Sequence, residues 1–175
     1  MSFFTFFAAL LVSIGSEAVM RFLDNMLASF FLLIFIIIIG IVFDTIGTAA
    51  TAAVTAPFNA QAAKKVLGAK QAVKITQNAD VVANYCNDVI GDIAGIVSGA
   101  LGAAIIFTLM GTFTYLDLSL TGATMTSFVA ALTVGGKAVG KSVAVNNAND
   151  IILQVGRIMA WWEKITGMKL FRYRR

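Results

Sequence analysis

The sequence predicts an all-α integral membrane protein with three core transmembrane helices, an N-terminal apolar helix, a basic cytoplasmic helix and a C-terminal juxtamembrane helix. Hydrophobic residues make up 59% of the chain and charged residues only 13%, whereas soluble domains carry about 25% charged residues. The segment from Met26 to Phe43 is uncharged over 18 residues, which is long enough to cross the hydrocarbon core of a bilayer. Lipid is therefore the expected solvent for most of the chain.

The first span is predicted at about residues 26–56, after an N-terminal apolar helix over residues 1–25. The N-terminal helix contains Glu17 and is predicted to be retained, because no basic residue precedes its apolar run as one does in a cleaved signal. Pro57 is the only proline and should end the first span or begin a new helix. The N-terminal helix either crosses the membrane or lies beside it, so the chain has three or four spans.

A basic amphipathic helix is predicted at residues 58–76, directly after the first span. Its apolar side chains recur at helical spacing with lysines around them, as in a helix at the cytoplasmic face of a membrane. The apolar stripe consists of Phe58, Ala62, Val66, Ala69 and Val73, and the lysines are Lys64, Lys65, Lys70 and Lys74.

The second and third spans are predicted at about residues 81–110 and 120–145. In the second span Gly91, Gly95 and Gly99 repeat every four residues. This small-xxx-small pattern lets helix backbones approach closely in lipid. We expect these glycines to pack helices, either within one chain or across a homodimer.

Residues 149–175 are predicted to form a juxtamembrane helix and a basic tail, after a transmembrane domain at residues 26–148. Trp161 and Trp162 beside basic residues are typical of a helix at the membrane interface. Of the 13 Lys and Arg residues, only Arg21 falls on the side opposite the lysine helix and the tail. The positive-inside rule therefore predicts a multi-pass protein of the cell membrane, plasma or inner, with its C-terminus in the cytoplasm.

Several function classes are disfavoured by what the sequence lacks. It contains no histidine and a single cysteine, Cys86, so Cys/His metal sites and histidine-based acid–base catalysis are excluded. No Ser/His/Asp set and no phosphate loop is present, and we predict that the protein is not an enzyme. The net charge of +4 comes from basic residues that flank apolar segments, so we expect a lipid bilayer and no nucleic acid as partner.

Five charged side chains fall within or beside the predicted spans: Asp44, Asp88, Asp92, Lys137 and Lys141. A charge at the centre of a membrane helix costs about 2.5–3.5 kcal/mol on insertion scales. The carboxylates at 88 and 92 are four residues apart, as are the two lysines, so each pair shares a helix face and the two faces can meet. The cluster is either a set of structural ion pairs or a polar cavity for a cation.

The cavity interpretation depends on the oxygen-bearing side chains near these carboxylates. Carboxylate, amide and hydroxyl oxygens are the ligands that hard cations such as Na⁺ and Mg²⁺ prefer. These side chains are Thr45, Thr48, Thr51, Asn84, Asn87, Asp88 and Asp92. No cofactor other than such an ion is predicted.

Three short stretches follow one another along the spans: FDTIGTAA at residues 43–50 before the lysine helix, CND at 86–88, and GKAVGK at 136–141. In this order they resemble the Ser-Gly-Ser-Glu-Thr-Ala, Gly-Asn-Asn and Gly-Glu-Ile-x-Pro-Lys motifs of the cyclin M (CNNM) and CorB/CorC family of magnesium transporters. The resemblance covers roughly residues 43–144.

The chain departs from the pattern of this family at three positions. Lys137 stands where the family has its cation-binding glutamate, Thr48 where it has its first-helix glutamate, and Asp88 where it has a motif asparagine. Lys141 matches the lysine of the family. Regulation through the paired nucleotide-sensing CBS modules of typical members is not expected of these 175 residues.

The resemblance implies a dimeric three-helix transmembrane fold with a cation site between helices, in a Na⁺-coupled Mg²⁺ transporter. We expect a transporter-like membrane protein for cations that works by alternating access. The ion-binding candidates are Asp44, Thr45, Thr48, Asn87, Asp88 and Asp92, with Asn87 and Asp88 as metal ligands and Lys137 and Lys141 as charge-compensating groups. The alternative is a non-transporting scaffold or accessory subunit in which Asp–Lys pairs hold helices together.

Overall fold

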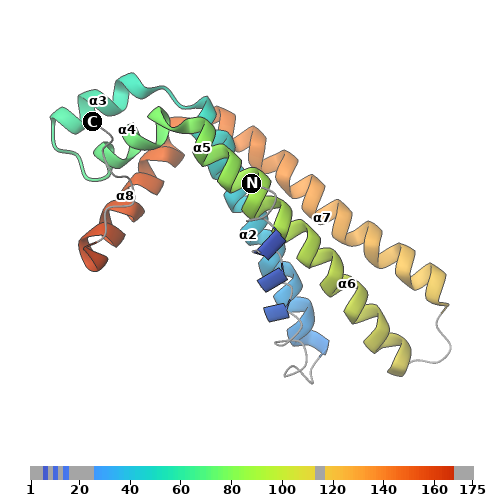
Figure 1. Ribbon diagram of the computed structural model, residues 1–175. Helices are drawn as coiled ribbons and strands as arrows, with labels where there is room; N and C mark the ends of the chain where they lie inside the picture. The colour runs from blue at the N-terminus through green and yellow to red at the C-terminus, as the bar shows by residue number, and fades with distance from the viewer. Residues whose placement is uncertain (1–5, 8–9, 12–13, 16–25, 113–116, 168–175) are drawn as a thin grey trace. The chain divides into compact units, whose positions relative to one another are not determined.

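The computed structural model describes residues 6–7, 10–11, 14–15, 26–112 and 117–167 (Figure 1). Its regular elements are all helices, and these described residues contain no strand. Three helices are long and apolar enough to cross a membrane: Leu27–Ala52, Ala79–Gly111 and Leu118–Asn146. The three predicted spans are therefore confirmed as helices of spanning length, and the chain is a membrane protein of helical type.

The predicted helix over residues 1–25 and the basic tail after Gly167 fall largely outside the described residues. Within the N-terminal segment, residues 6–7, 10–11 and 14–15 are helical, and all but Gly15 are exposed apolar side chains. Arg21 also lies outside the described residues.

The chain divides into two compact units, and each is described by itself. The first consists of the described residues of 1–43 and 88–139. It contains the first part of α2 (Met26–Ala52), α6 (Asp92–Thr112) and most of α7 (Leu118–Asn146). Its core is built by apolar side chains at helical spacing, and the buried members are Leu33, Ile37, Val89, Ile93, Val97, Leu101, Ile105 and Val129.

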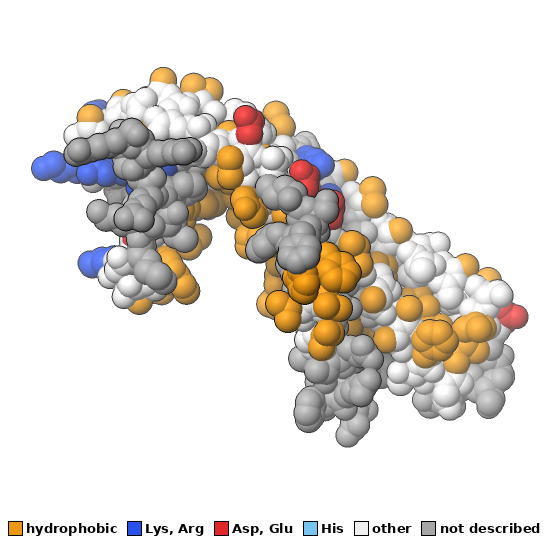
Figure 2. Space-filling view, in the orientation of Figure 1, with side chains coloured by type: hydrophobic (Ala, Val, Ile, Leu, Met, Phe, Trp, Pro, Cys, Tyr) orange, Lys and Arg blue, Asp and Glu red, His pale blue; other side chains and the backbone are white. Residues whose placement is uncertain are grey.

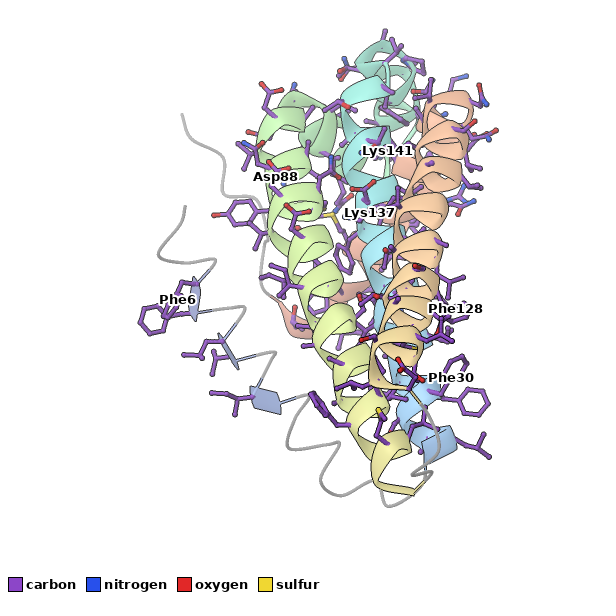
Figure 3. The ribbon with its side chains drawn as sticks, turned by 90° about the vertical axis from the view of Figure 1, so that its right-hand side faces the viewer. Phe6, Phe30, Asp88, Phe128, Lys137 and Lys141 are labelled. Atoms are coloured by element: carbon purple, nitrogen blue, oxygen red, sulfur yellow. The ribbon has the colours of Figure 1, made fainter. Side chains whose placement is uncertain are left out.

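Small residues set how closely the helices of the first unit approach one another. A Cβ on Gly40 of α2 would lie 2.9 Å from Ala94 Cβ, and a Cβ on Gly136 of α7 would overlap Ile41. Between α2 and α7 the rings of Phe30 and Phe128 are stacked, with centroids 6.1 Å apart (Figure 3). In lipid there is little hydrophobic driving force for helix association, so such van der Waals contacts stabilise the packing of the helices.

The second unit consists of residues 44–87 and the described residues of 140–175. It holds the end of α2 together with α3 (Thr55–Ala63), α4 (Ala69–Gln77), α5 (Ala79–Ala83) and α8 (Ala148–Thr166). Its buried core contains Ala49, Ala50, Phe58, Ala72, Ile75, Ala144, Ala148 and Ile152. The amide N–H of Val54 donates to Asn149 Oδ1 at 2.9 Å and ties the start of α3 to α8.

The prediction of one helix over residues 58–76 was wrong, because the structure has α3 and α4 with a turn between them. In this turn Lys65 has φ 59° and Gly68 has φ 85°. Gly68 lies against the backbone of α8, where a Cβ would come within 2.7 Å of the carbonyl carbon of Gly156. This backbone contact requires glycine, and it turns the chain so that α4 packs along α8.

The second candidate span also differs locally from a regular α-helix. Residues Asn84–Gly91 form a π-helix, η1, between α5 and α6. π-helical segments are rare and occur frequently at functional sites. The polar start of the predicted second span therefore coincides with the least regular part of that helix.

Candidate functional site

Asp44 lies inside the first candidate span, within α2 of the second unit. Its side chain is only 4% exposed, and its Oδ2 lies 3.6 Å from Lys141 Nζ of α7. The Lys141 side chain is 53% exposed. The carboxylate is therefore held in the interior, whereas the ammonium that faces it reaches the surface.

Asn87 brings an amide oxygen to the same face of α2. A Cβ on Gly47 would overlap Asn87 Oδ1 and lie 2.8 Å from Asn87 Cγ, so only glycine leaves room for this amide. Gly47 and Thr48 are three and four residues after Asp44, which places all three on one helix face. Asn87 Oδ1 is buried and accepts no hydrogen bond from the residues that the structure describes.

Three threonines complete the polar surroundings in α2. The Thr48 hydroxyl donates to the Asp44 carbonyl oxygen at 2.9 Å, which leaves the lone pairs of that hydroxyl oxygen as acceptors. The Thr51 hydroxyl donates in turn to the Thr48 carbonyl at 2.9 Å. Thr45 is half-buried, one residue after Asp44. Carboxylate, amide and hydroxyl oxygens, which are the ligand types that hard cations prefer, thus occur on or against one turn of α2.

The other charged candidates lie in the first unit. Lys137 Nζ is 3.5 Å from Asp92 Oδ1, with the lysine side chain 23% exposed and the aspartate 64% exposed. Asp88 is exposed in η1 (Figure 3). The exposure pattern is thus the reverse of that at Asp44, because here the carboxylate faces the outside.

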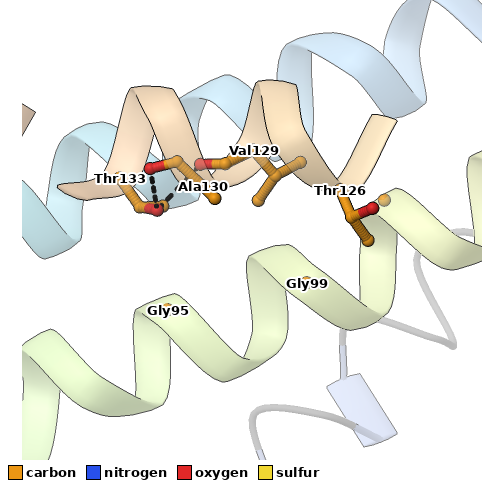
Figure 4. Close-up of a pocket in the computed structure, with 7 residues that line it drawn as sticks. Gly95, Gly99, Thr126, Val129, Ala130 and Thr133 are labelled. Atoms are coloured by element: carbon orange, nitrogen blue, oxygen red, sulfur yellow. Dashed lines mark hydrogen bonds between the residues drawn. The ribbon is translucent and has the colours of Figure 1, made fainter. Parts of the chain in front are cut away.

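The three repeated glycines occupy different environments. Gly91 is buried, and its carbonyl oxygen lies 3.7 Å from the position of a Cβ on Gly40. Gly95 and Gly99 have no atom within 4 Å of such a position. These two line an open cavity of about 240 Å³ between α6 and α7 (Figure 4), and its other lining residues are Gly102, Thr126, Val129, Ala130 and Thr133.

The predicted site residues are divided between the two units. Asp44, Thr48, Asn87 and Lys141 belong to one unit, whereas Asp88, Asp92 and Lys137 belong to the other. Within the described residues no group of three or more His, Cys, Asp or Glu side chains could hold a metal. Gly47 was missed by sequence reasoning, although its place between Asp44 and Thr48 was a signal for close approach.

No family model matches the chain, and neither the curated proteins nor the solved structures yield a match. The structure itself defines the class, which is a membrane protein with helices and three candidate spans in the part of the chain that is described. The resemblance of residues 43–144 to the CNNM and CorB/CorC family stays a prediction from the sequence motifs.

Proposed function

We propose that this protein is transporter-like and moves cations across the membrane, with Mg²⁺ as the cargo and Na⁺ as the coupling ion. The observation that carries the proposal is the burial of the Asp44 carboxylate within a candidate span, 3.6 Å from an exposed lysine. Ionisable residues inside membrane helices are costly and are by default candidates for a functional site such as an ion pathway.

Lys141 acts in this proposal as a tethered cation that competes with the cargo. Its ammonium neutralises Asp44 when no ion is bound. An arriving cation takes the carboxylate, together with the oxygens of Asn87 and Thr48, and the lysine swings outward through the surface that it already reaches. Mg²⁺ usually keeps several of its waters and uses one or two carboxylates, so a single aspartate with neutral oxygens is a sufficient ligand set. Alternating exposure of this site would then move the ion.

Calorimetric titration of the purified protein in detergent with MgCl₂ and NaCl tests the proposal. We expect saturable binding that Asp44→Asn abolishes. Asp92→Asn is the matched control, since it is the same substitution at a carboxylate that is 64% exposed, and it should leave binding intact. Lys141→Gln should tighten binding because it removes the competing ammonium.

Equal binding by Asp44→Asn and the parent protein would contradict the assignment of the site. If binding behaves as expected, Mg²⁺ flux into proteoliposomes, with and without a Na⁺ gradient, tests transport itself. Binding without flux would limit the function to ion sensing or storage at the membrane.

A non-transporting scaffold or accessory subunit is the second candidate, and the exposure of α7 favours it. Only 6% of the apolar window of Leu118–Asn146 is buried, compared with 44% for Ala79–Gly111, so much of α7 is available to another helix. Exchanging the charges, with Asp44→Lys and Lys141→Asp in one protein, separates the two candidates. A structural pair survives the exchange and keeps its stability, whereas a cation site is lost.

We further propose a homodimer in the cell membrane with a cytoplasmic C-terminus. The cavity beside Gly95 and Gly99 and the exposed α7 support a second copy as the helix partner. Crosslinking of a cysteine placed at Thr126, in a Cys86→Ser background, should give dimers only if α7 faces its copy. Reporter fusions at the C-terminus test the orientation.

A further inference from the structure

Helix α8 has two apolar faces, and only one of them is covered by the described residues. The covered face contains the buried residues Ile152 and Gly156, and Gly156 lies against Gly68 and Ala72 of the α4 segment. On this side Gln71 Nε2 donates to Glu163 Oε2 at 2.8 Å. The contact with α4 thus fixes the rotation of α8 about its axis.

The other apolar face points away from α4. Its residues follow the spacing i, i+3, i+4 and i+7, which makes one stripe along a helix. They are Ile158, Trp161, Trp162 and Ile165, with exposed fractions of 66%, 60%, 49% and 62%. We call this stripe the outer face of α8. Such large side chains are rarely left in water as a contiguous group.

Cationic side chains border the outer face. Arg157 and Lys164 are exposed and precede Ile158 and Ile165 by one residue, so they lie at the edge of the stripe. Exposed lysines also gather beside α3 and α4, as Figure 2 shows, and these are Lys64, Lys65 and Lys70. The acidic Glu163 does not belong to this border, because it accepts the hydrogen bond from Gln71 on the side of α8 that faces α4. The outer face is therefore apolar with a positive border.

We propose that the outer face of α8 binds an anionic lipid surface. Tryptophans prefer the headgroup level of a bilayer, an apolar stripe with Lys and Arg at its edge is typical of a helix in the interface plane, and anionic lipids attract such charges. The described part of the same chain has three helices of spanning length, which hold the protein in a bilayer. The charge of the border favours phospholipid headgroups of negative charge over a neutral surface.

The test uses the two tryptophans of the chain, which both lie on this face. The full-length protein is placed in nanodiscs of brominated phosphatidylcholine, alone or in equal mixture with brominated phosphatidylglycerol. We expect bromolipid to quench the tryptophan fluorescence in the mixture, with iodide in the water having little effect. In pure phosphatidylcholine the bromolipid quenching should fall.

Two double variants at the border decide whether charge is the cause. Arg157→Gln with Lys164→Gln should weaken attachment to the anionic discs roughly 30-fold, since each basic residue near such a surface contributes about five-fold. Arg157→Lys with Lys164→Arg keeps both charges and should behave as the parent. Raising the ionic strength should reproduce the effect of the first variant.

Three results would overturn the proposal. Quenching by iodide and not by bromolipid would mean that the outer face lies in water. Quenching by neither would mean that protein covers it, either a second copy or another segment of this chain. Quenching by bromolipid that is equal in both disc types and in both variants would refute the anionic requirement.

Discussion

Adding a methyl group at Gly156 should loosen α8 from α4. A Cβ there would overlap the Gly68 carbonyl oxygen and lie 3.1 Å from Ala72 N, and both obstacles are backbone that cannot rotate away. Overpacking of this kind costs about 1–3 kcal/mol, and the upper part of that range, about 2–3 kcal/mol, applies here because both obstacles are backbone, whereas the helix propensity of alanine returns about 1 kcal/mol. The expected net loss for Gly156→Ala is therefore about 1–2 kcal/mol in the free energy of local opening.

Hydrogen exchange of the α8 amides, read by mass spectrometry, measures this loss directly. A destabilisation of this size should speed their exchange about 5- to 30-fold. Gly95→Ala is the matched control, because it lies in helix α6 with no atom within 4 Å of the added Cβ, and it should leave α8 exchange unchanged. Equal α8 exchange in Gly156→Ala and the parent would refute the backbone contact between α4 and α8.

Two further predictions concern lysines. Lys141→Met removes the ammonium from a carboxylate that is 4% exposed and should cost on the order of 3 kcal/mol in unfolding free energy. Lys137→Met removes the ammonium from an exposed carboxylate and should cost below about 1 kcal/mol. Unfolding titrations in mixed detergent compare the two variants, and equal losses would contradict the difference in burial. Lys65 has φ 59°, so Lys65→Gly should gain about 0.5–1 kcal/mol. Lys64, with φ −80°, should lose stability on the same substitution, and thermal unfolding that shows the opposite order would refute the strain.

The three spans could be predicted closely because their signal is summed over many residues. The predicted ranges 26–56, 81–110 and 120–145 match the observed Leu27–Ala52, Ala79–Gly111 and Leu118–Asn146 within a few residues. A long apolar stretch suits lipid as a helix, since every backbone polar group is then satisfied within the segment. No single contact decides this outcome, and sequence alone suffices for it.

The break between α3 and α4 could not be predicted, because its cause lies far away in the chain. The local sequence does not distinguish Gly68 from an ordinary helical glycine, and only its contact with Gly156 of α8 shows why the chain turns there. Local periodicity continues through the turn and favours one helix. The π-helix at Asn84–Gly91 was missed for a different reason, since no simple residue pattern marks the change of hydrogen bonding.

The pairing of the charges was predicted only in part. Spacing indicated that Asp88 and Asp92 share one face and Lys137 and Lys141 another, but it says nothing about the register between helices. The structure pairs Asp92 with Lys137 and Asp44 with Lys141. Register is set by close packing over whole helix faces, such as the contact of Gly136 with Ile41, and the charged side chains follow it.

The unequal burial of the Asp44–Lys141 pair separates two reasons for keeping a charge in a membrane helix. A pair retained for stability has little to gain from ionic chemistry, because well-packed apolar residues can replace buried ion pairs at equal or better stability. Here the carboxylate is 4% exposed and the lysine 53% exposed, so the lysine can leave without uncovering the core. The carboxylate would then remain on the face of α2 that also carries Gly47, and the buried amide oxygen of Asn87 lies against Gly47. An interior anion with a removable cation is the arrangement that ion exchange requires, and this asymmetry favours the cation-handling proposal over a purely structural pair.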